Sequence, residues 1–183
     1  MALFANIIII ILELIGLSIS IGIRKWKVFV FYTQISNIIA FISSVCYVLA
    51  PMSPISTTLR YISTVMLIVT FIVTTCVLIP MGGDAHELMF AGNGLYHHTL
   101  VPIISVFSYI VLEPHIQNKA LVWIPLIISM IYGFTMLYMN YSYKYDGPYP
   151  FFRVHKQGMT ASVLWTGGLM VFIFLLSYGV YLL

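Results

Sequence analysis

Side chains that could do chemistry stand in two short segments of an otherwise apolar sequence. Thr33 opens one of them, Thr-Gln-Ile-Ser-Asn, and the other runs from Asn93 to Thr99 and contains the adjacent residues His97 and His98. A hydroxyl beside an imidazole forms a nucleophile–base pair, because the imidazole takes the hydroxyl proton as the oxygen attacks an acyl carbon. Adjacent helical residues point about 100° apart, so we expect one of the two histidines to face the interior.

Amide groups near these residues predict the supporting part of such a site. Asn37, Gln34, Asn93 or backbone N–H groups near Gly94 could stabilise an oxyanion. His98 is a further supporting candidate. The alternative is interhelical hydrogen bonding without chemistry, at about 0.6 kcal/mol for each contact.

A metal site is the other chemistry that the histidines allow. Histidine and carboxylate side chains bind zinc, which activates water. No HExxH spacing occurs, and two of the candidates lie in predicted loops. The candidate ligands are His86, Glu87, His97, His98 and His155.

Two further polar features need an explanation. Glu13 lies in the middle of the first apolar run, about 16 Å along a helix axis from Arg24. A proton relay, a structural hydrogen bond and an orienting partner for a histidine all remain open for Glu13.

The segment 141–158 has turn residues followed by an aromatic and proline run, which predicts a cap over the bundle or an interfacial anchor. Its candidate residues are Asp146, Tyr149, Pro150, Phe151 and Arg153.

The composition identifies the medium in which these groups must be held. The 183 residues are 61% hydrophobic and 7% charged, whereas soluble domains average about 25% charged residues. The lipid bilayer is therefore the expected solvent. The net charge of +3 rests on few cations, so it does not indicate nucleic-acid binding, and the predicted chemistry requires no cofactor or metal.

Apolar runs of about 20 residues predict membrane-spanning helices. We expect an all-α, polytopic bundle of six transmembrane helices that forms one domain over residues 1–183. Pro102 and Pro125 fall inside spans and predict kinks in the fourth and fifth helices. The predicted spans are 3–23, 28–50, 60–80, 95–113, 120–141 and 160–182.

Topology places the polar segments on one side of the membrane. The second and fourth spans both begin on the side of the loops after spans one, three and five, and the 141–158 loop lies there too. Six of the eight Lys and Arg residues are on that side, which predicts that it is cytoplasmic and that both termini are outside. The six are Arg24, Lys25, Lys27, Lys144, Arg153 and Lys156, against Arg60 and Lys119 on the other side.

Three segments in this frame resemble a known family. FYTQISN (31–37), LYHHTLVPII (95–104) and GPYPFF (147–152) occur in that order on span two, on span four and before span six. They resemble the androgen-induced-gene and androgen-dependent TFPI-regulating protein family, and more closely its bacterial six-helix relatives. The resemblance extends over most of residues 27–152.

The resemblance implies a membrane threonine hydrolase that cleaves a lipid-like acyl ester, such as a fatty acid ester of a hydroxy fatty acid, in a bacterial inner membrane. Thr33 resembles the nucleophile of that family. His97, with Thr99 and Pro102 at matching offsets, resembles the base, and His98 stands where the animal members have Thr. The animal members are usually drawn with cytoplasmic termini, opposite to the charge count.

A small-molecule binding or transport subunit is the alternative function. Vitamin-binding components of energy-coupling transporters also have six helices in a chain of about this length. Such a subunit needs a small-residue face for docking a partner helix, for which Gly167 and Gly168 are the candidates.

Overall fold

The protein is an all-helical membrane protein whose six long helices are each apolar enough to cross a bilayer. The computed structural model describes residues 1–183. It confirms the predicted fold class, with six spans and no β-strand. The spans run over Ala2–Val30, Tyr32–Leu49, Pro54–Leu78, Gly92–Leu112, Lys119–Tyr141 and Met159–Tyr181.

The ends of the spans differ from the prediction where local chemistry extends a helix. Helix α1 (Ala2–Arg24) continues into the 3-10 helix η1 (Lys25–Val30), which connects it to α2 (Tyr32–Leu49). Helix α3 (Pro54–Val73) begins six residues before the predicted 60, because Ser53 caps its N-terminus and Pro54 occupies the first turn. The span ends as a short π-helix, η2 (Thr74–Leu78).

The fourth span is assembled from several short helical segments. The one-turn helix α4 (Ala85–Met89) precedes it, and α5 (Gly92–Gly94), the π-helix η3 (Leu95–Leu100) and α6 (Val101–Leu112) form the span itself. Pro102 is the second residue of α6 and directly follows the π-helix, and the kink expected there stays a prediction.

Pro125 lies close to the start of its helix, and the kink expected there also stays a prediction. The fifth span opens with the 3-10 helix η4 (Lys119–Val122), and helix α7 (Trp123–Tyr141) begins only at Trp123. Pro125 therefore lies in the first helical turn, where a backbone N–H has no partner within the helix to lose.

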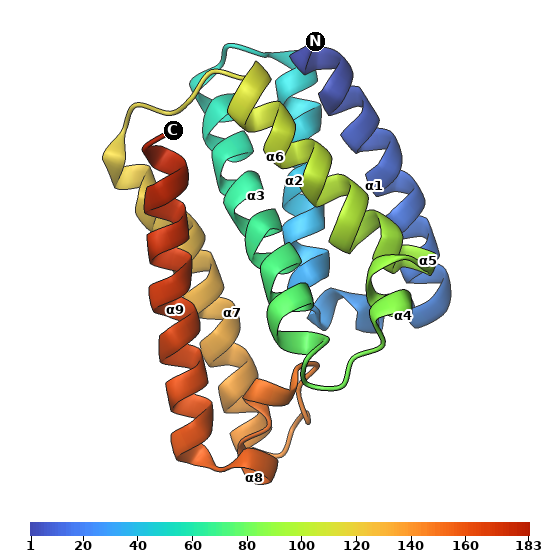
Figure 1. The fold of residues 1–183 in the computed structure, drawn as a ribbon, viewed down its shortest axis with the longest axis vertical. Coiled ribbons are helices and arrows are strands. Elements are labelled where there is room, and N and C mark those ends of the chain that lie inside the picture. The colour runs from blue at the N-terminus through green and yellow to red at the C-terminus, as the bar shows by residue number, and fades with distance from the viewer. The chain divides into compact units, whose positions relative to one another are not determined.

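The chain divides into two compact units, one of residues 1–119 with Leu183 and one of residues 120–182. In the first unit α1, α2, α3 and α6 form a ring of four helices, in which each contacts the next and α6 contacts α1 (Figure 1). One buried apolar residue from each helix meets at its centre, namely Ile9, Ala40, Leu67 and Val101. The prediction of a single domain stays a prediction.

The second unit is a pair of helices with an ordered connection between them. Helices α7 and α9 (Met159–Tyr181) pack together, and both contact the 3-10 helix η5 (Pro150–Phe152) and the short helix α8 (Val154–Gln157). Phe151 and Phe152 are buried, and the Phe151 ring lies 6.0 Å from that of Trp165. The Asn140 side-chain oxygen accepts a hydrogen bond of 2.6 Å from the Val154 N–H.

The candidate cap loop is therefore anchored on its own two helices. Tyr149 is buried, and its ring stacks on Phe151 at 5.3 Å. Asp146 accepts a 2.8 Å hydrogen bond from Lys156, with Arg153 at 3.9 Å. The hydrogen bond from Lys156 is the main cause that keeps the pKa of Asp146 below its ordinary value.

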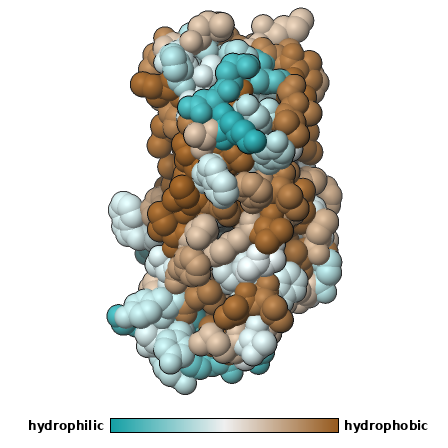
Figure 2. Space-filling view, turned by 90° about the vertical axis from the view of Figure 1, so that its left-hand side faces the viewer, coloured by the Kyte–Doolittle hydropathy of each residue, from teal (hydrophilic) through white to brown (hydrophobic).

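The outer surface is that of an integral membrane protein. Many large apolar side chains are exposed along the spans, including Phe4, Ile131 and Leu164. Figure 2 shows that apolar residues make up much of the visible surface. Apolar side chains on the outside of the spans suit contact with the hydrocarbon of a bilayer.

Candidate functional site

Thr33 lies at the start of α2 and contacts a histidine 65 residues away in the chain. Phe31 is extended and ends the connection from η1, so Thr33 is in the first turn of α2. Its Oγ1 lies 3.1 Å from Nε2 of His98, which is carried by the π-helix η3. The sequence expectation that the two polar segments meet is thus confirmed for this pair.

The other ring nitrogen of His98 fixes which nitrogen carries the proton. Its Nδ1 lies 2.6 Å from the Leu88 carbonyl oxygen, which can only accept a hydrogen bond. In the neutral imidazole Nδ1 therefore carries the proton and donates it to Leu88. Nε2 is left with its lone pair toward Thr33, so the Thr33 hydroxyl donates to His98.

The short helix α4 holds the orienting carbonyl in place. Asp84 caps α4 by accepting a 2.9 Å hydrogen bond from the Glu87 N–H, and Thr99 Oγ1 donates to the Met89 carbonyl at 2.7 Å. A Cβ on Gly94 would lie 2.4 Å from the Glu87 carbonyl oxygen. Gly94 therefore lets the start of the fourth span approach α4 closely enough for His98 to reach Leu88.

His97, the base expected from the resemblance, has different partners. Its Nδ1 accepts a 2.9 Å hydrogen bond from the Gln34 side-chain amide, and the Ser20 hydroxyl lies 3.5 Å from the same nitrogen. Its Nε2 lies 3.4 Å from Oε2 of Glu13. Both ring nitrogens thus face groups other than Thr33, and the structure places His98 where His97 was expected.

The two histidines also differ in how much of each residue is exposed. Thr33 is 7% exposed and His98 is 8% exposed, whereas His97 is 0% exposed. A Cβ on Gly16 of α1 would lie 2.4 Å from His97 Nε2, so the glycine creates the space that the buried ring occupies. Thr33 and His98 therefore each keep a small accessible surface, which His97 lacks.

Asn37 serves the backbone rather than an oxyanion. Its side-chain N–H groups donate to the Thr33 carbonyl at 2.7 Å and the His97 carbonyl at 3.3 Å. The His97 carbonyl needs a donor because the Val101 N–H bonds Tyr96 in the π-helix, and Pro102 has no N–H. Asn37 therefore stabilises the π-helix that presents both histidines.

The other two amides expected to stabilise an oxyanion are placed differently from each other. The Gln34 amide nitrogen donates to His97 and to Ser20, the latter at 3.3 Å. Asn93 is half-buried in α5, at the start of the fourth span. Of the three amides, Asn93 is the one whose N–H groups are not already donated to a protein acceptor.

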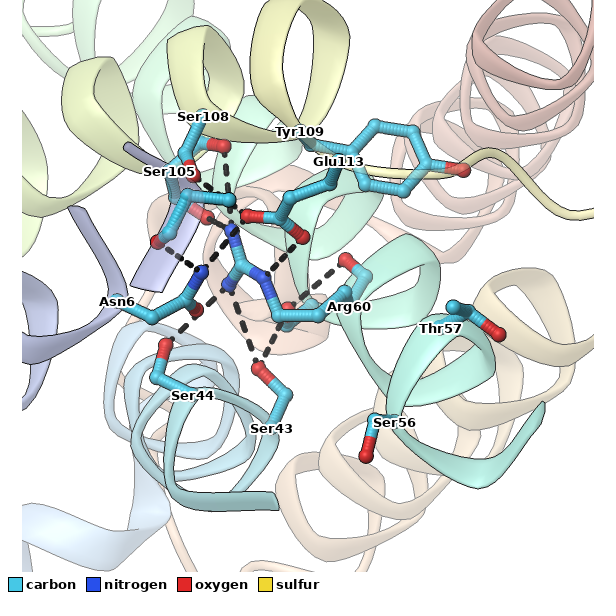
Figure 3. Close-up of polar contacts among 12 residues, drawn as sticks. Asn6, Ser43, Ser44, Ser56, Thr57, Arg60, Ser105, Ser108, Tyr109 and Glu113 are labelled. Carbon is cyan, nitrogen blue, oxygen red and sulfur yellow. Dashed lines mark hydrogen bonds and ion pairs between the residues drawn. The ribbon is translucent and has the colours of Figure 1, made fainter. Parts of the chain in front are cut away.

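A second buried polar cluster lies at the other end of the same four helices (Figure 3). Arg60 Nε donates to Glu113 Oε2 at 2.8 Å, and both side chains are almost completely buried. Glu113 Oε1 accepts hydrogen bonds from Asn6 at 2.9 Å and Ser108 at 2.5 Å. The remaining guanidinium N–H groups donate to Ser43, Ser44 and Ser105.

Sequence reasoning missed this cluster because it treated Arg60 as a charge of the membrane surface. One available signal was that Arg60 and Glu113 lie near the same membrane face, at the start of span three and the end of span four. An ion pair whose every donor and acceptor is satisfied is a structural connection among four helices.

The residues proposed as metal ligands do not converge. No three His, Cys, Asp or Glu side chains gather in a geometry that could hold a metal ion. His155 lies in the second unit, where its Nε2 is 3.1 Å from the Asn140 carbonyl and its ring stacks on Tyr143 at 3.9 Å.

The candidate docking glycines lie on open surface. A Cβ added to Gly167 or Gly168 of α9 would meet no heavy atom within 4 Å.

Comparisons of the chain with family models, with curated proteins and with solved structures find no match. The family resemblance stays a prediction made from three short segments.

Proposed function

We propose that this protein is a membrane-embedded ester hydrolase in which Thr33 is the nucleophile and His98 the general base. The observation that carries the proposal is the chain of contacts from Thr33 Oγ1 to His98 Nε2 at 3.1 Å and from His98 Nδ1 to the Leu88 carbonyl at 2.6 Å. The same order of nucleophile, imidazole and orienting acceptor defines catalytic triads. A backbone carbonyl here takes the place of the usual carboxylate.

The reaction follows from the protonation states of this chain of groups. Thr33 Oγ attacks the acyl carbon while its proton moves to His98 Nε2, and the imidazolium is stabilised by the Leu88 carbonyl dipole. His98 then returns that proton to the leaving alcohol, which leaves an acyl-Thr33 ester. A water molecule deprotonated by His98 hydrolyses this ester, releasing the acid and restoring the Thr33 hydroxyl.

The start of α2 supplies a favourable place for the oxyanion. Thr33 lies in the first turn of α2, which has 18 residues. Phe31, the residue that precedes this helix, has no side-chain group that could cap it. The N-terminal end of a helix carries partial positive charge, which favours a developing anion. Asn93 is the side-chain amide with N–H groups left to assist.

The surroundings favour a lipid-like ester as substrate. Thr33 and His98 lie near one end of membrane-spanning helices, so a substrate dissolved in the bilayer reaches them with its polar ester near the interface and its acyl chain among the apolar side chains. The resemblance of FYTQISN and LYHHTLVPII to membrane threonine hydrolases points to the same class.

The test is labelling of the purified full-length protein in detergent by a fluorophosphonate, which forms a covalent adduct with activated hydroxyls. We expect Thr33 to carry the adduct, Thr33→Ala to lose it, and His98→Gln to slow labelling by about 10²-fold or more, because general-base catalysis contributes about that much. Thr166→Ala is the matched control, because Thr166 is also a buried threonine but its hydroxyl donates to the Ser162 carbonyl and not to a histidine.

The comparison of the two histidines is decisive for the base. If His97→Gln abolishes labelling and His98→Gln does not, His97 is the base and the assignment to His98 is wrong. An adduct on another residue, or labelling that survives Thr33→Ala, contradicts the hydrolase proposal itself.

A further inference from the structure

Glu13 is a buried carboxyl group with few polar groups near it. It lies in the middle of α1, is 0% exposed, and neither of its oxygens has a hydrogen-bond partner. The one polar group close to it is His97 Nε2, at 3.4 Å from Oε2. Nothing in the proposed reaction at Thr33 and His98 uses this carboxyl group.

Glu113, the other buried carboxyl group, shows what an ionised carboxylate requires in this fold. It contacts the Arg60 guanidinium and accepts two further hydrogen bonds, from Asn6 and Ser108. Glu13 has no cation and no hydrogen-bond donor comparable to these. An unpaired charge at such a depth is among the costliest features of a membrane protein.

The elements packed around α1 bring no fixed positive charge to Glu13. They are α2, α5, α6, η1 and η3. The side chain on α2 that reaches the His97 ring is the Gln34 amide, and on η3 the further titratable groups are His98 and Tyr96. The Tyr109 ring of α6 lies beside Tyr61 near the Arg60 cluster, and the lysines of η1, Lys25 and Lys27, are exposed. The pair of Glu13 and His97 therefore has no net charge only when it holds one more proton than an ionised carboxylate beside a neutral imidazole.

From this geometry we infer that Glu13 and His97 form a membrane-embedded proton-binding site, separate from the Thr33–His98 pair. The ligand is a single proton taken up from water, which binds to a carboxyl oxygen of Glu13. The site needs no cavity for a larger ligand, because a Cβ on Gly16 would already collide with the His97 ring.

Proton uptake is coupled through the imidazole to the side chain of Gln34. With the Gln34 amide nitrogen facing Nδ1, the His97 proton is on Nε2 and points toward an ionised Glu13. When Glu13 binds a proton, its carboxyl O–H donates a hydrogen bond to Nε2. The imidazole proton must then be on Nδ1. The Gln34 side chain then turns to offer Oε1, an oxygen that is buried without a partner in the present arrangement.

Nuclear magnetic resonance of the full-length protein in lipid nanodiscs tests this inference without any substrate. Samples carry 13C in the glutamate carboxyl groups and 15N in the histidine rings, and spectra are recorded across a pH titration. The chain has three glutamates, Glu13, Glu87 and Glu113, so the exposed Glu87 and the ion-paired Glu113 serve as internal references.

We expect one carboxyl signal with the chemical shift of a protonated acid, lost in Glu13→Gln and retained in Glu87→Gln. In the same titration the His97 ring should pass from the Nδ1–H form to the Nε2–H form as Glu13 releases its proton. In Glu13→Gln this change of tautomer should no longer follow pH.

Three results would overturn the inference. Glu13 could remain a carboxylate over the whole range in which the protein is folded, or His97 could keep one tautomer while Glu13 titrates. The acid signal could also respond to sodium concentration at fixed pH, which identifies a cation rather than a proton as the ligand. The wild-type spectra decide all three, even if the Glu13 variant does not fold.

Discussion

At the scale of single residues, His97 and His98 differ in their hydrogen-bond partners. The two side chains leave the helix about 100° apart, and each has one nitrogen held by a group of known hydrogen-bonding character. The Leu88 carbonyl gives His98 a basic nitrogen toward Thr33, whereas the Gln34 amide gives His97 an N–H toward Glu13. Sequence similarity aligns residue types, but the hydrogen-bond partner of each ring decides its role.

The buried ion pair of Arg60 and Glu113 predicts an asymmetric response to mutation. Arg60→Met or Glu113→Leu alone leaves the other charge buried and unpaired, so each should lower the free energy of unfolding by about 3–5 kcal/mol. The double variant removes both charges and should recover much of that loss. Reversible unfolding in mixed micelles measures all three proteins.

Lys156→Met is the control for this set, because it breaks an ion pair with Asp146 in which both side chains are largely exposed. Its unfolding should be indistinguishable from that of the parent protein. If the double variant is less stable than either single variant, the charges are not a pair that act together.

At the scale of elements, the π-helix η3 allows one span to present both histidines. Its wider turns leave the His97 carbonyl without a backbone donor at Pro102, and Asn37 of α2 supplies the missing hydrogen bond. Gly16 and Gly94 let the same segment approach α1 and α4. The sequence contains all of these residues, but a hydrophobicity pattern cannot show that they act on one short segment.

Two glycines of α1 provide a matched test of this packing. A Cβ on Gly16 would meet His97 and Tyr96 closer than 3.0 Å, whereas a Cβ on Gly22 would meet nothing within 4 Å. Gly16→Ala should therefore lower the free energy of unfolding by about 1–3 kcal/mol. Gly22→Ala should leave it unchanged or raise it by up to about 1 kcal/mol, because alanine favours helix over glycine.

Thermal unfolding in detergent, monitored by circular dichroism, measures both variants. Equal effects of the two substitutions would mean that η3 does not pack on α1 as closely as the structure has it.

At the scale of the whole molecule, the buried ion pair sharpens the predicted orientation. Arg60 is neutralised by Glu113 inside the protein, so it is not one of the loop charges that orient a membrane protein. Of the eight Lys and Arg residues, six remain on the side of the loops after spans one, three and five. Lys119 alone remains on the opposite side, which strengthens the prediction that both termini lie outside the cytoplasm.

Fusions of alkaline phosphatase, which is active only outside the cytoplasm, test this orientation in a bacterial inner membrane. A fusion after Leu183 should be active, and a fusion after Gly83, in the loop between spans three and four, should be inactive. The opposite pattern would show that the charge count does not set the topology of this protein.

The amino-acid sequence alone determined the number of spans and the meeting of the two polar segments. Apolar runs of about 20 residues fix where helices can cross a bilayer, and the alternation of spans brings the start of span two and the start of span four to the same side. Glu13 was recognisable as unusual for the same reason, because a carboxyl group in such a run needs an explanation.

The tertiary structure decided which groups face one another. Thr33 meets His98 across 65 residues, and Asn6 meets Glu113 across 107. A rotation of this segment by a single residue, about 100°, would bring His97 to the place that His98 occupies. Hydrogen-bond partners at such separations depend on how helices pack, and an apolar pattern leaves that rotation undetermined.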